Sequence, residues 1–484
     1  MLKVVKNILD RVNECHIDYC HWKSNNLLKE CLENAEELDL LVEESRRSDF
    51  EHVIKDLGFL ETHEPFTNRH IHIVHYYGLD LETGLLVHLH VYYRLITGGA
   101  MVKNHYFPIS DHYFKNLQHY HGVSAPCPEI EMILLMIRKT IEYYSHIERF
   151  FLKRELIHVR NELIWLQERI DRTKLNKVRE RLFPGFSEKM LSDAIELFMG
   201  QYNFKKGYHL GKKFNLFFRG YTLKHPIIAE LKRCIMFFKL VIDVKILKPR
   251  IQRWINPKGM VLSFVGSEAC GKTTSIKEVE KWLLGAYDVR MYHCGKPPAS
   301  VYTILFRYLI SFYVLLKARF RTASSNKELV KEQREAENIP HPVVSLLDSI
   351  DRLCLTNKLH KLKEKGVIVL TDRYPNNNRG AIDGPRIPED CRWSFLINLE
   401  LYFYKKVKPI DHLLKLYAPL EVTLERNAKR DNPEPESFVR MRYEKFHSQK
   451  FNTSMSEINT NVSFGESFRT IKGAIWTFII RKYK

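Results

Sequence analysis

The sequence predicts a multidomain α/β protein, and three observations support this fold class. At 484 residues, the chain is longer than one ordinary hydrophobic core accommodates. From Gly259 onward, short apolar runs alternate with helical patterns, which is typical of a parallel sheet flanked by helices. From residue 125 to about residue 200, apolar residues recur at helical spacing, which indicates a helical middle region.

These patterns predict four segments. The first is an α+β domain, the second a helical bundle, the third a basic helical connector and the fourth a parallel-sheet domain. Their predicted boundaries are 1–120, 121–200, 201–255 and 256–484. The sequence shows no internal repeat.

The first segment mixes helical and strand patterns. Its opening stretch MLKVVKNILDRVNE has apolar residues at helical spacing mixed with acids, which predicts a helix rather than a signal-peptide core. LDLLV predicts a strand and SDFEHVIKDLGF a helix. The alternating segments HIHIVHYYG and LLVHLHVYYRL predict two paired strands.

The composition is that of a globular protein, with 45% hydrophobic and 27% charged residues. Nine cysteines are scattered along the chain without a CxxC pair or a metal-like cluster. Because the set is odd in number and no secretory signal precedes it, the cysteines indicate reduced thiols and a cytoplasmic location.

The formal charge of +19 favours an anionic partner. Residues 201–250 carry 12 Lys and Arg against 2 acids, a net charge of +10. This segment is predicted to meet nucleic acid, an anionic membrane surface or a polyphosphate, and a solvated basic face without a ligand is the alternative. Peripheral membrane contact is therefore a second hypothesis on localisation.

Two apolar segments raise the question of a membrane span. VYTILFRYLISFYVLLK, residues 301–317, falls short of the roughly 20 residues that a crossing needs, and Arg307 lies near its middle. A crossing there would also part the glycine-rich loop before it from Asp372 after it. We therefore predict no transmembrane segment, but a buried or interfacial helix. For CIMFFKLVIDVKIL, residues 234–247, a membrane-surface segment and a packed linker helix both stay open.

The stretch GSEACGKTT, residues 266–274, is the strongest functional signal. It satisfies G-x-x-x-x-G-K-[ST], follows the strand pattern VLSFV and precedes the helical pattern SIKEVEKWLL. Backbone N–H groups of such a loop converge on phosphate oxygens, and the helix adds its positive N-terminal end. We expect Lys272 to reach the β- and γ-phosphates of ATP and the Thr273 hydroxyl to hold Mg²⁺. The predicted nucleotide-binding residues are Gly266, Ser267, Glu268, Ala269, Cys270, Gly271, Lys272, Thr273 and Thr274.

A second element supplies an acid. KGVIVLTDRYP, residues 365–375, is a buried-strand pattern that ends in Asp372 and Arg373. A carboxylate at the carboxyl end of a neighbouring strand can orient Mg²⁺, its waters or the acceptor. Taken alone, this Asp-Arg pair is also compatible with a structural ion pair. Together with the phosphate loop about 100 residues before it, the pair predicts a phosphoryl-transfer site.

GSEACGKTT followed by VIVLTDRYP resembles the thymidylate kinase branch of the nucleoside monophosphate kinases, which are P-loop enzymes. That family usually has an acid in the loop where Glu268 stands, and its DRY motif matches residues 372–374. HLLKLYAPLEVTLERNAKR, residues 412–430, is similar to the family's later strand, helix and arginine-bearing lid. The resemblance covers about 259–450.

The resemblance implies that Arg426 and Arg430 are lid arginines, which neutralise charge on the transferring phosphoryl group. Ordinary exposed helix arginines are the alternative. The chain departs from the family at Tyr417, where an acid is common, and in PNNNRGAIDGPR, which replaces a serine-rich continuation after DRY. The resemblance therefore does not identify thymidylate as the acceptor. The residues predicted to face the acceptor are Arg379, Asp383 and Arg386.

The first segment carries a separate pair of carboxylates. In EELDLLVEE, residues 36–44, Glu37 and Asp39 are two apart, so both point to one face of a strand. Two carboxylates on one face suit a metal-assisted nucleotidyl transfer. With YCHWKSNN, residues 19–26, the arrangement resembles the minimal nucleotidyltransferase fold. That resemblance implies that Lys23 and Ser24 stand in a triphosphate-holding turn.

The third acid of such a site has no clear counterpart. On LLVHLHVYY, where this third acid is expected, the chain has His88 instead. Asp80 and Glu82 lie only in the adjacent loop. His88 and His90 share one strand face, which suits either metal binding or a structural role. An active nucleotidyltransferase and a binding module of the same fold both stay open.

The primary hypothesis is a kinase that transfers a phosphoryl group from ATP, with Mg²⁺, to a small acceptor such as a nucleoside monophosphate or a related metabolite. Its predicted catalytic residues are Lys272, Asp372, Arg373, Arg426 and Arg430, and its predicted metal ligands are Thr273 and Asp372, with Glu37 and Asp39 in the first segment. One alternative is a bifunctional kinase and nucleotidyltransferase. Another is an ATP-gated module that docks on nucleic acid or a membrane. Neither the acceptor nor the oligomeric state follows from the sequence.

Overall fold

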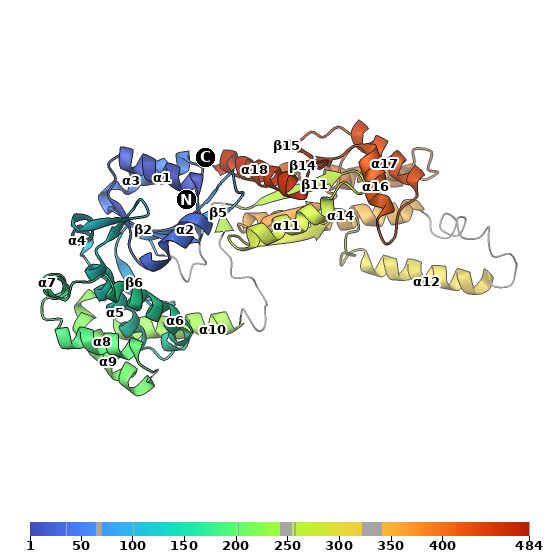
Figure 1. Ribbon diagram of the computed structural model, residues 1–484. Coiled ribbons are helices and arrows are strands. Elements are labelled where there is room, and N and C mark those ends of the chain that lie inside the picture. Colours follow the sequence, from blue (N-terminus) through green and yellow to red (C-terminus); the bar gives the residue numbers. More distant parts are fainter. Residues whose placement is uncertain are drawn as a thin grey trace. The chain divides into compact units, whose positions relative to one another are not determined.

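The computed structural model describes residues 1–34, 36–63, 70–99, 101–201, 203–242, 254–255, 258–321 and 341–483. The chain forms two compact units, one of residues 1–253 with 479–484 and one of residues 254–478 (Figure 1). The predicted boundary at residue 256 lies outside the described residues. The finer boundaries at residues 120 and 200 remain predictions.

The first unit is built around five strands in the order β1-β2-β5-β4-β3. Their bounds are β1 (Tyr19–His21), β2 (Glu37–Val42), β3 (Leu60–His63), β4 (Ile73–Leu79) and β5 (Leu86–Tyr92). β2 and β5 run parallel, and the other neighbours run antiparallel. The predicted pairing of HIHIVHYYG with LLVHLHVYYRL is confirmed by β4 and β5.

Strand alternation gives this sheet two faces that pack into different clusters, and the face of Leu41 also carries polar residues. Leu38 and Leu40 of β2 belong to a buried cluster with side chains of the first three helices. Those helices are α1 (Lys3–Glu14), α2 (Leu28–Asn34) and α3 (Arg47–Asp56). Glu37 and Asp39 alternate with these leucines, so they point to the opposite face of the sheet. The predicted helices at the N-terminus and in SDFEHVIKDLGF are confirmed.

A second buried cluster of this unit joins sheet residues such as Leu41 and Tyr92 to the side chains of five helices. They are α5 (Pro128–Glu142), α6 (Glu148–Gln167), α7 (Arg172–Leu182), α8 (Glu188–Met199) and α9 (Phe204–Phe217). Local chemistry sets where several of them begin. Pro128 occupies the first turn of α5, and the Ser187 and Asn203 side chains accept hydrogen bonds from backbone N–H groups at the start of α8 and α9.

Helical packing continues past residue 200, into the segment predicted as a basic connector. Leu210 and Phe214 of α9 are buried in the same cluster as α5 and α8. Helix α10 (Pro226–Ile242) buries Ala229 and Met236 against Val102, while much of its apolar surface is exposed. Residues 243–253 of the predicted connector lie outside the described residues.

Smaller elements complete the first unit. They are β6 (Ile96–Gly98), β7 (Lys103–Tyr106), α4 (Ser110–Lys115), β8 (Leu117–Tyr120), β9 (Val123–Pro126) and the short 3₁₀ turns at Asn25–Leu27, Glu44–Arg46 and Phe218–Tyr221. β6 pairs with β7 and β8 pairs with β9, each antiparallel.

The second unit contains a five-stranded parallel sheet in the order β12-β13-β11-β14-β15, as predicted. The strands are β11 (Met260–Gly266), β12 (Val289–His293), β13 (Ile368–Asp372), β14 (His412–Tyr417) and β15 (Met455–Asn459). The chain leaves β11 towards β12 on one side and leaves β14 towards β15 on the other. In such sheets a crevice opens between the two diverging connections, at the carboxyl ends of the strands.

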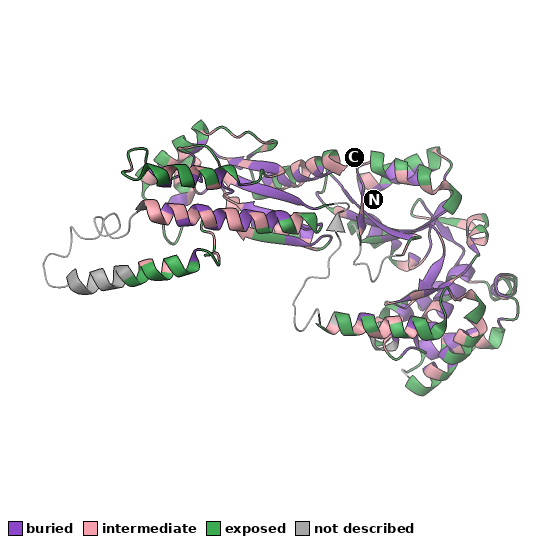
Figure 2. Ribbon diagram, turned by 180° about the vertical axis from the view of Figure 1, so that it is seen from behind, coloured by how far each residue is buried: buried purple, intermediate pink, exposed green. Residues whose placement is uncertain are grey.

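Helices flank both faces of this parallel sheet, which is why its central strands β11 and β13 are mostly buried, whereas the edge strands β12 and β15 are largely exposed (Figure 2). Val261 and Val369 form a buried cluster with residues of α14. Leu262 and Leu370, the next residues along the same strands, turn to the other face and are also buried. The helices are α11 (Lys272–Leu284), α12 (Ile304–Arg321), α14 (His341–Glu364), α15 (Ser394–Lys405), α16 (Leu420–Ala428), α17 (Glu436–Ser448) and α18 (Phe464–Tyr483), and the unit begins with the two-residue strand β10 (Trp254–Ile255).

Helix α12 covers most of the segment for which a buried or interfacial helix is predicted. The buried alternative is wrong for its described side chains, because Leu305, Phe306 and Leu309 are exposed. Arg307 extends to α14, where its guanidinium pairs with Asp348 and Asp351 at 2.7 Å each. None of the described helices combines the length and apolarity that a bilayer crossing requires.

The fully buried Glu142, in the last turn of α5, makes the stability of the first unit depend on pH. Burial raises the pKa of Glu142 to about 7, and the neighbouring Lys139 offsets only part of this rise. The folded state then holds a proton that the unfolded state releases near pH 4.5, so stability falls as pH rises from about 4.5 to about 7. Each pKa unit corresponds to about 1.4 kcal/mol.

We expect thermal unfolding of the Glu142→Gln variant to be less sensitive to pH between 5 and 7.5 than that of the wild type, because Gln stays neutral. The measurement is the melting temperature across this range. Glu196→Gln, at an exposed carboxylate of α8, is the matched control and should keep the wild-type slope. If the melting temperatures of Glu142→Gln and wild type change equally with pH, the pH dependence does not come from Glu142.

Candidate active site

The loop predicted to bind phosphate, called the phosphate loop below, joins the end of β11 to the start of α11, as predicted. Gly271 has φ of +90°, and Ala269 has φ of 56°, so the backbone turns twice through the left-handed region. Gly is the residue that adopts this region without strain. Because α11 begins at Lys272, its first backbone N–H groups have no helical acceptor and face the loop.

Lys272 and Ser267 bring polar groups to the inside of the loop. The Lys272 ammonium donates to the carbonyl oxygens of Gly266 at 2.9 Å and Ser267 at 2.6 Å. The Ser267 hydroxyl is buried and makes no hydrogen bond. The loop therefore combines a positive charge, a helix N-terminus and an unsatisfied hydroxyl in one concave segment.

Asp372 lies beside this loop because parallel strands end at one edge of the sheet. In the register of the sheet, Asp372 of β13 is opposite Phe264 of β11 and His293 of β12. The Asp372 Oδ2 atom is 3.1 Å from His293 Nδ1. Its Oδ1 atom is buried and makes no hydrogen bond, so one oxygen of this carboxylate remains for a ligand.

Arg373 and Asp383 form an ion pair next to Asp372. Arg373 has φ of 61°, a left-handed conformation that is strained for a side chain with a Cβ. Its Nε lies 3.5 Å from Asp383 Oδ1. Burial raises the pKa of Asp383, and the guanidinium groups of Arg373, Arg352 and Arg386 counteract the rise.

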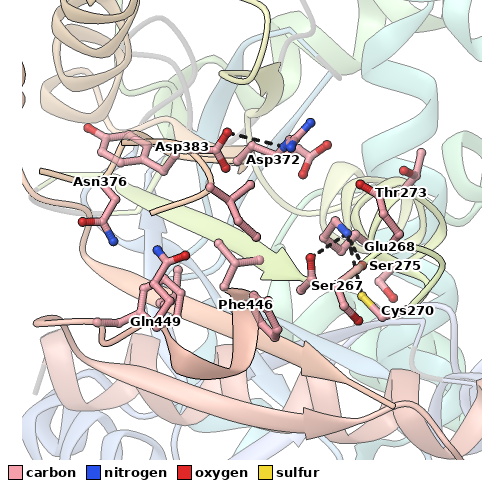
Figure 3. A pocket seen from close by; sticks show the side chains of 18 of the residues that line it. Ser267, Glu268, Cys270, Thr273, Ser275, Asp372, Asn376, Asp383, Phe446 and Gln449 are labelled. Atoms are coloured by element: carbon pink, nitrogen blue, oxygen red, sulfur yellow. Dashed lines mark hydrogen bonds and ion pairs between the residues drawn. The ribbon is translucent and has the colours of Figure 1, made fainter. Parts of the chain in front are cut away.

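These residues line one cavity of about 880 Å³. Figure 3 shows Ser267, Cys270 and Thr273 on its loop side, with Asn376 and Gln449 across from them. Of the predicted site residues, the structure places the following around this cavity: Gly266, Ser267, Glu268, Ala269, Cys270, Gly271, Lys272, Thr273, Thr274, Asp372, Arg373, Asp383, Arg426 and Arg430.

Glu268 links the loop to two arginines. Its carboxylate forms an ion pair with Arg442 of α17 and lies 3.7 Å from Arg430. Burial acts to raise the pKa of Glu268, but the positive charges of Lys272, Arg442 and Arg373 outweigh it and lower the pKa. Glu268 is thus the anionic centre of a cationic cluster.

A second hollow of about 580 Å³ shares Arg373, Ile382 and Arg442 with the first. Arg386, predicted to face the acceptor, is in its lining. Arg379, predicted for the same role, is in the lining of neither hollow and lies 3.3 Å from Glu389. Of the three residues predicted to face the acceptor, Asp383 lines the first hollow, Arg386 lines the second and Arg379 lines neither.

Three residues of this site were not predicted from the sequence. His293 ends a short strand, and the position of that strand end was the signal that could have found it. Arg442 lies 174 positions after its partner Glu268, in a helix that carries no motif. Arg352 is buried and donates to the carbonyl oxygens of Asp383 and Gly295. It therefore holds one lining residue of each hollow in place.

In the first unit, the predicted metal ligands Glu37 and Asp39 lie close to each other and to His90. Asp39 Oδ1 is 2.8 Å from Lys23 Nζ and 3.0 Å from His90 Nδ1, and Glu37 is close to the same histidine. The histidine that meets both carboxylates is thus His90, and His88 lies farther away, at 3.6 Å from Glu37.

The other residues named with that site serve the local fold. Asp80 accepts hydrogen bonds from the backbone N–H groups of Val4 and Thr83, and Glu82 pairs with Lys3. The backbone N–H of Ser24 donates to a carboxylate oxygen of Glu162 at 3.1 Å.

Comparisons with known proteins add a distant structural likeness. No protein-family model matches the chain, and no curated protein matches it. Among solved structures, the chain is similar to thymidylate kinase from Candida albicans, at 14% identity and a TM-score of 0.29. The match covers 47% of this chain and 93% of that one.

Gly266 is the position where a small substitution should disrupt the phosphate loop. A Cβ there would lie 2.4 Å from Cys270 Sγ and 2.6 Å from the carbonyl oxygen of Leu416 in β14. Because the central sheet holds that carbonyl in place, the loop itself would have to move. We expect Gly266→Ala to weaken the binding of a fluorescent ATP analogue by about tenfold or more, since several loop N–H groups would lose their alignment.

Gly285→Ala is the matched control, because a Cβ at Gly285 meets nothing within 4 Å. Both variants should keep the wild-type circular dichroism spectrum. Wild-type affinity for the analogue in Gly266→Ala would contradict the assignment of this loop to phosphate binding.

Proposed function

We propose that the second unit is a kinase that transfers the γ-phosphoryl group of ATP to a small anionic acceptor. One observation carries the proposal. The P-loop, the Asp372 carboxylate and four guanidinium groups line a single cavity of about 880 Å³. The four are Arg373, Arg426, Arg430 and Arg442.

The residues fit a magnesium ion that accompanies ATP. Asp372 offers a buried carboxylate oxygen without a hydrogen-bond partner, and the exposed Thr273 hydroxyl lines the same cavity. Carboxylate and hydroxyl oxygens are ligands that Mg²⁺ accepts, usually together with water and phosphate oxygens. When bound, the ion would neutralise charge on the β- and γ-phosphates.

The chain's own groups would supply positioning and charge. The loop N–H groups and Lys272 hold the phosphates, and the arginines face the charge that spreads over the γ-phosphoryl oxygens during transfer. An acceptor oxygen forms the new bond to the γ-phosphorus, and the bond to the bridging oxygen of ADP breaks. Arg426 is already oriented by its hydrogen bond to the carbonyl oxygen of Thr460 at 2.8 Å.

The charge of the second hollow supports an anionic acceptor. Its lining contains six basic side chains and the single acid Asp348. The basic residues are Lys296, Arg307, Arg373, Arg386, Arg442 and Lys445. Arg307, Arg373, Arg386 and Arg442 each pair with a carboxylate, so Lys296 and Lys445 supply most of the excess positive charge. An acceptor that already carries a phosphate or carboxylate group suits this surface better than a neutral one.

Lys272→Ala should abolish ATP-dependent phosphorylation while the protein stays folded. Removing a charge that contacts the transferring group costs about 100-fold or more in rate. The measurement is ADP formation with a panel of nucleoside monophosphates and sugar phosphates, with products read by mass spectrometry. Lys281→Ala, at an exposed lysine on the same helix, is the matched control. If the wild type forms no ADP with any acceptor of the panel, the kinase proposal fails.

Arg386→Ala should raise the KM for the acceptor found in that panel by about tenfold and leave the KM for ATP unchanged. One charge-assisted hydrogen bond to an anionic group is worth about 1.5 to 3 kcal/mol, which corresponds to this factor or more. Arg379→Ala is the control from the same loop, since Arg379 lies outside both hollows. Equal acceptor KM values in the two variants would place the acceptor elsewhere.

A further inference from the structure

Three side chains of the first unit converge on one point of its sheet. Glu37 and Asp39 of β2 and His90 of β5 each offer one ligand atom, and these atoms lie within 4.8 Å of one another. His90 Nδ1 is 3.0 Å from Asp39 Oδ1 and closer still to a carboxylate oxygen of Glu37. None of the three belongs to the proposed kinase site of the second unit.

The strands themselves hold this geometry. β2 and β5 are parallel neighbours, with Asp39 opposite His90 in the register. Glu37 lies two residues before Asp39, so its side chain emerges on the same face. The three side chains therefore come from regular backbone in the middle of a sheet, where ligand positions are more rigid than on loops.

The buried polar atoms of the cluster contact one another and Lys23 without well-aligned hydrogen bonds. Asp39 and His90 are 8% and 6% exposed. Asp39 Oδ1 has Lys23 Nζ and His90 Nδ1 as ion-pair contacts but no hydrogen bond of acceptable geometry. Buried polar groups nearly always have a partner. A cation between the two carboxylates and His90 Nδ1 would supply that partner.

Neighbouring histidines fix the orientation of the His90 ring. His75 of β4 stacks on His90, with ring centroids 4.2 Å apart. His75 Nδ1 lies 2.9 Å from His88 Nε2, which ties that stacked ring to β5. Metal-binding histidines are commonly held by such surrounding contacts.

We propose that Glu37, Asp39 and His90 bind one divalent ion of the Mn²⁺ or Zn²⁺ type, in preference to Mg²⁺. Imidazole nitrogen is a good ligand for Zn²⁺ and its neighbours, whereas Mg²⁺ favours oxygen ligands and keeps its waters. Two carboxylates also supply the negative charge that a dication needs.

Lys23 places a positive charge beside the proposed ligands. Its ammonium is 2.8 Å from Asp39 Oδ1, where it repels any cation bound there. Lys23 and His90 both line a hollow of about 160 Å³ whose other charged residues are Lys103, Arg138, Lys139, Glu142, Glu148 and Glu155. Water in this hollow can complete the coordination of the ion, because three protein ligands leave at least one position open.

The test uses the full-length chain, stripped of metal with a chelator and kept free of nucleotide. Mn²⁺ is titrated by electron paramagnetic resonance, and Zn²⁺ and Mg²⁺ by calorimetry. We expect one Mn²⁺ or Zn²⁺ per chain at this site, bound at least about tenfold more tightly than Mg²⁺. Glu37→Gln, Asp39→Asn and His90→Asn should each weaken Mn²⁺ binding by about tenfold or more. His119→Asn, at an exposed histidine of β8, is the matched control.

Two further variants make the result decisive. Lys23→Met should tighten Mn²⁺ binding several-fold, because it removes a like charge next to the ion. Asp372→Asn should weaken any ion binding by the second unit, so that binding by the first unit can be measured apart from it. Glu37 is partly exposed, so Glu37→Gln should fold even if His90→Asn does not. Mn²⁺ binding that is unchanged in Glu37→Gln and Asp39→Asn overturns the site, and equal affinity for Mg²⁺ overturns the proposed class of ion.

Discussion

The parallel pairing of β11 with β13 and β14 is the constraint on which the candidate active site depends. Parallel strands end at one edge of a sheet, so the loop after β11 and the carboxylate at the end of β13 meet although they are far apart in sequence. The pairing is stable because helices bury both faces of the sheet. The apolar core and the polar site are therefore consequences of the same strand order.

Charge balance is the second organising feature of this site. Lys272 and the arginines around the cavity would repel one another without an anion between them. Glu268 provides that anion from within the phosphate loop and pairs with Arg430 and Arg442. The lowered pKa of Glu268 shows that these cations outweigh the cost of burying its charge. The cluster thus holds arginines over the segment where the phosphates of ATP are proposed to bind.

The first unit places its polar cluster by the same geometric principle. β2 and β5 are its parallel pair, and their register sets Asp39 opposite His90. Strand alternation separates Glu37 and Asp39 from Leu38 and Leu40, which pack on the helices α1 to α3. Helices α5 to α9 pack with Leu41 and Tyr92 of the sheet in a second core, and this core includes the first part of the segment predicted as a connector. The charge of that segment was visible in the sequence, but which of its apolar residues are buried was not.

Local sequence patterns were sufficient to predict the phosphate loop, the strand that ends in Asp372 and the shared face of the two carboxylates of β2. Each depends on residues close together in the chain, whose spacing is set by strand and helix geometry. The partners of these residues could not be predicted in the same way. Arg442 and His293 reach the active site only through strand register and helix packing, which join distant segments. His90 was a candidate in the sequence beside His88, but only the strand register shows that His90 is the one that meets both carboxylates. The sequence by itself determined which chemical groups each site starts from, and the tertiary structure decided which groups face them, because contacts between distant segments leave no local periodicity.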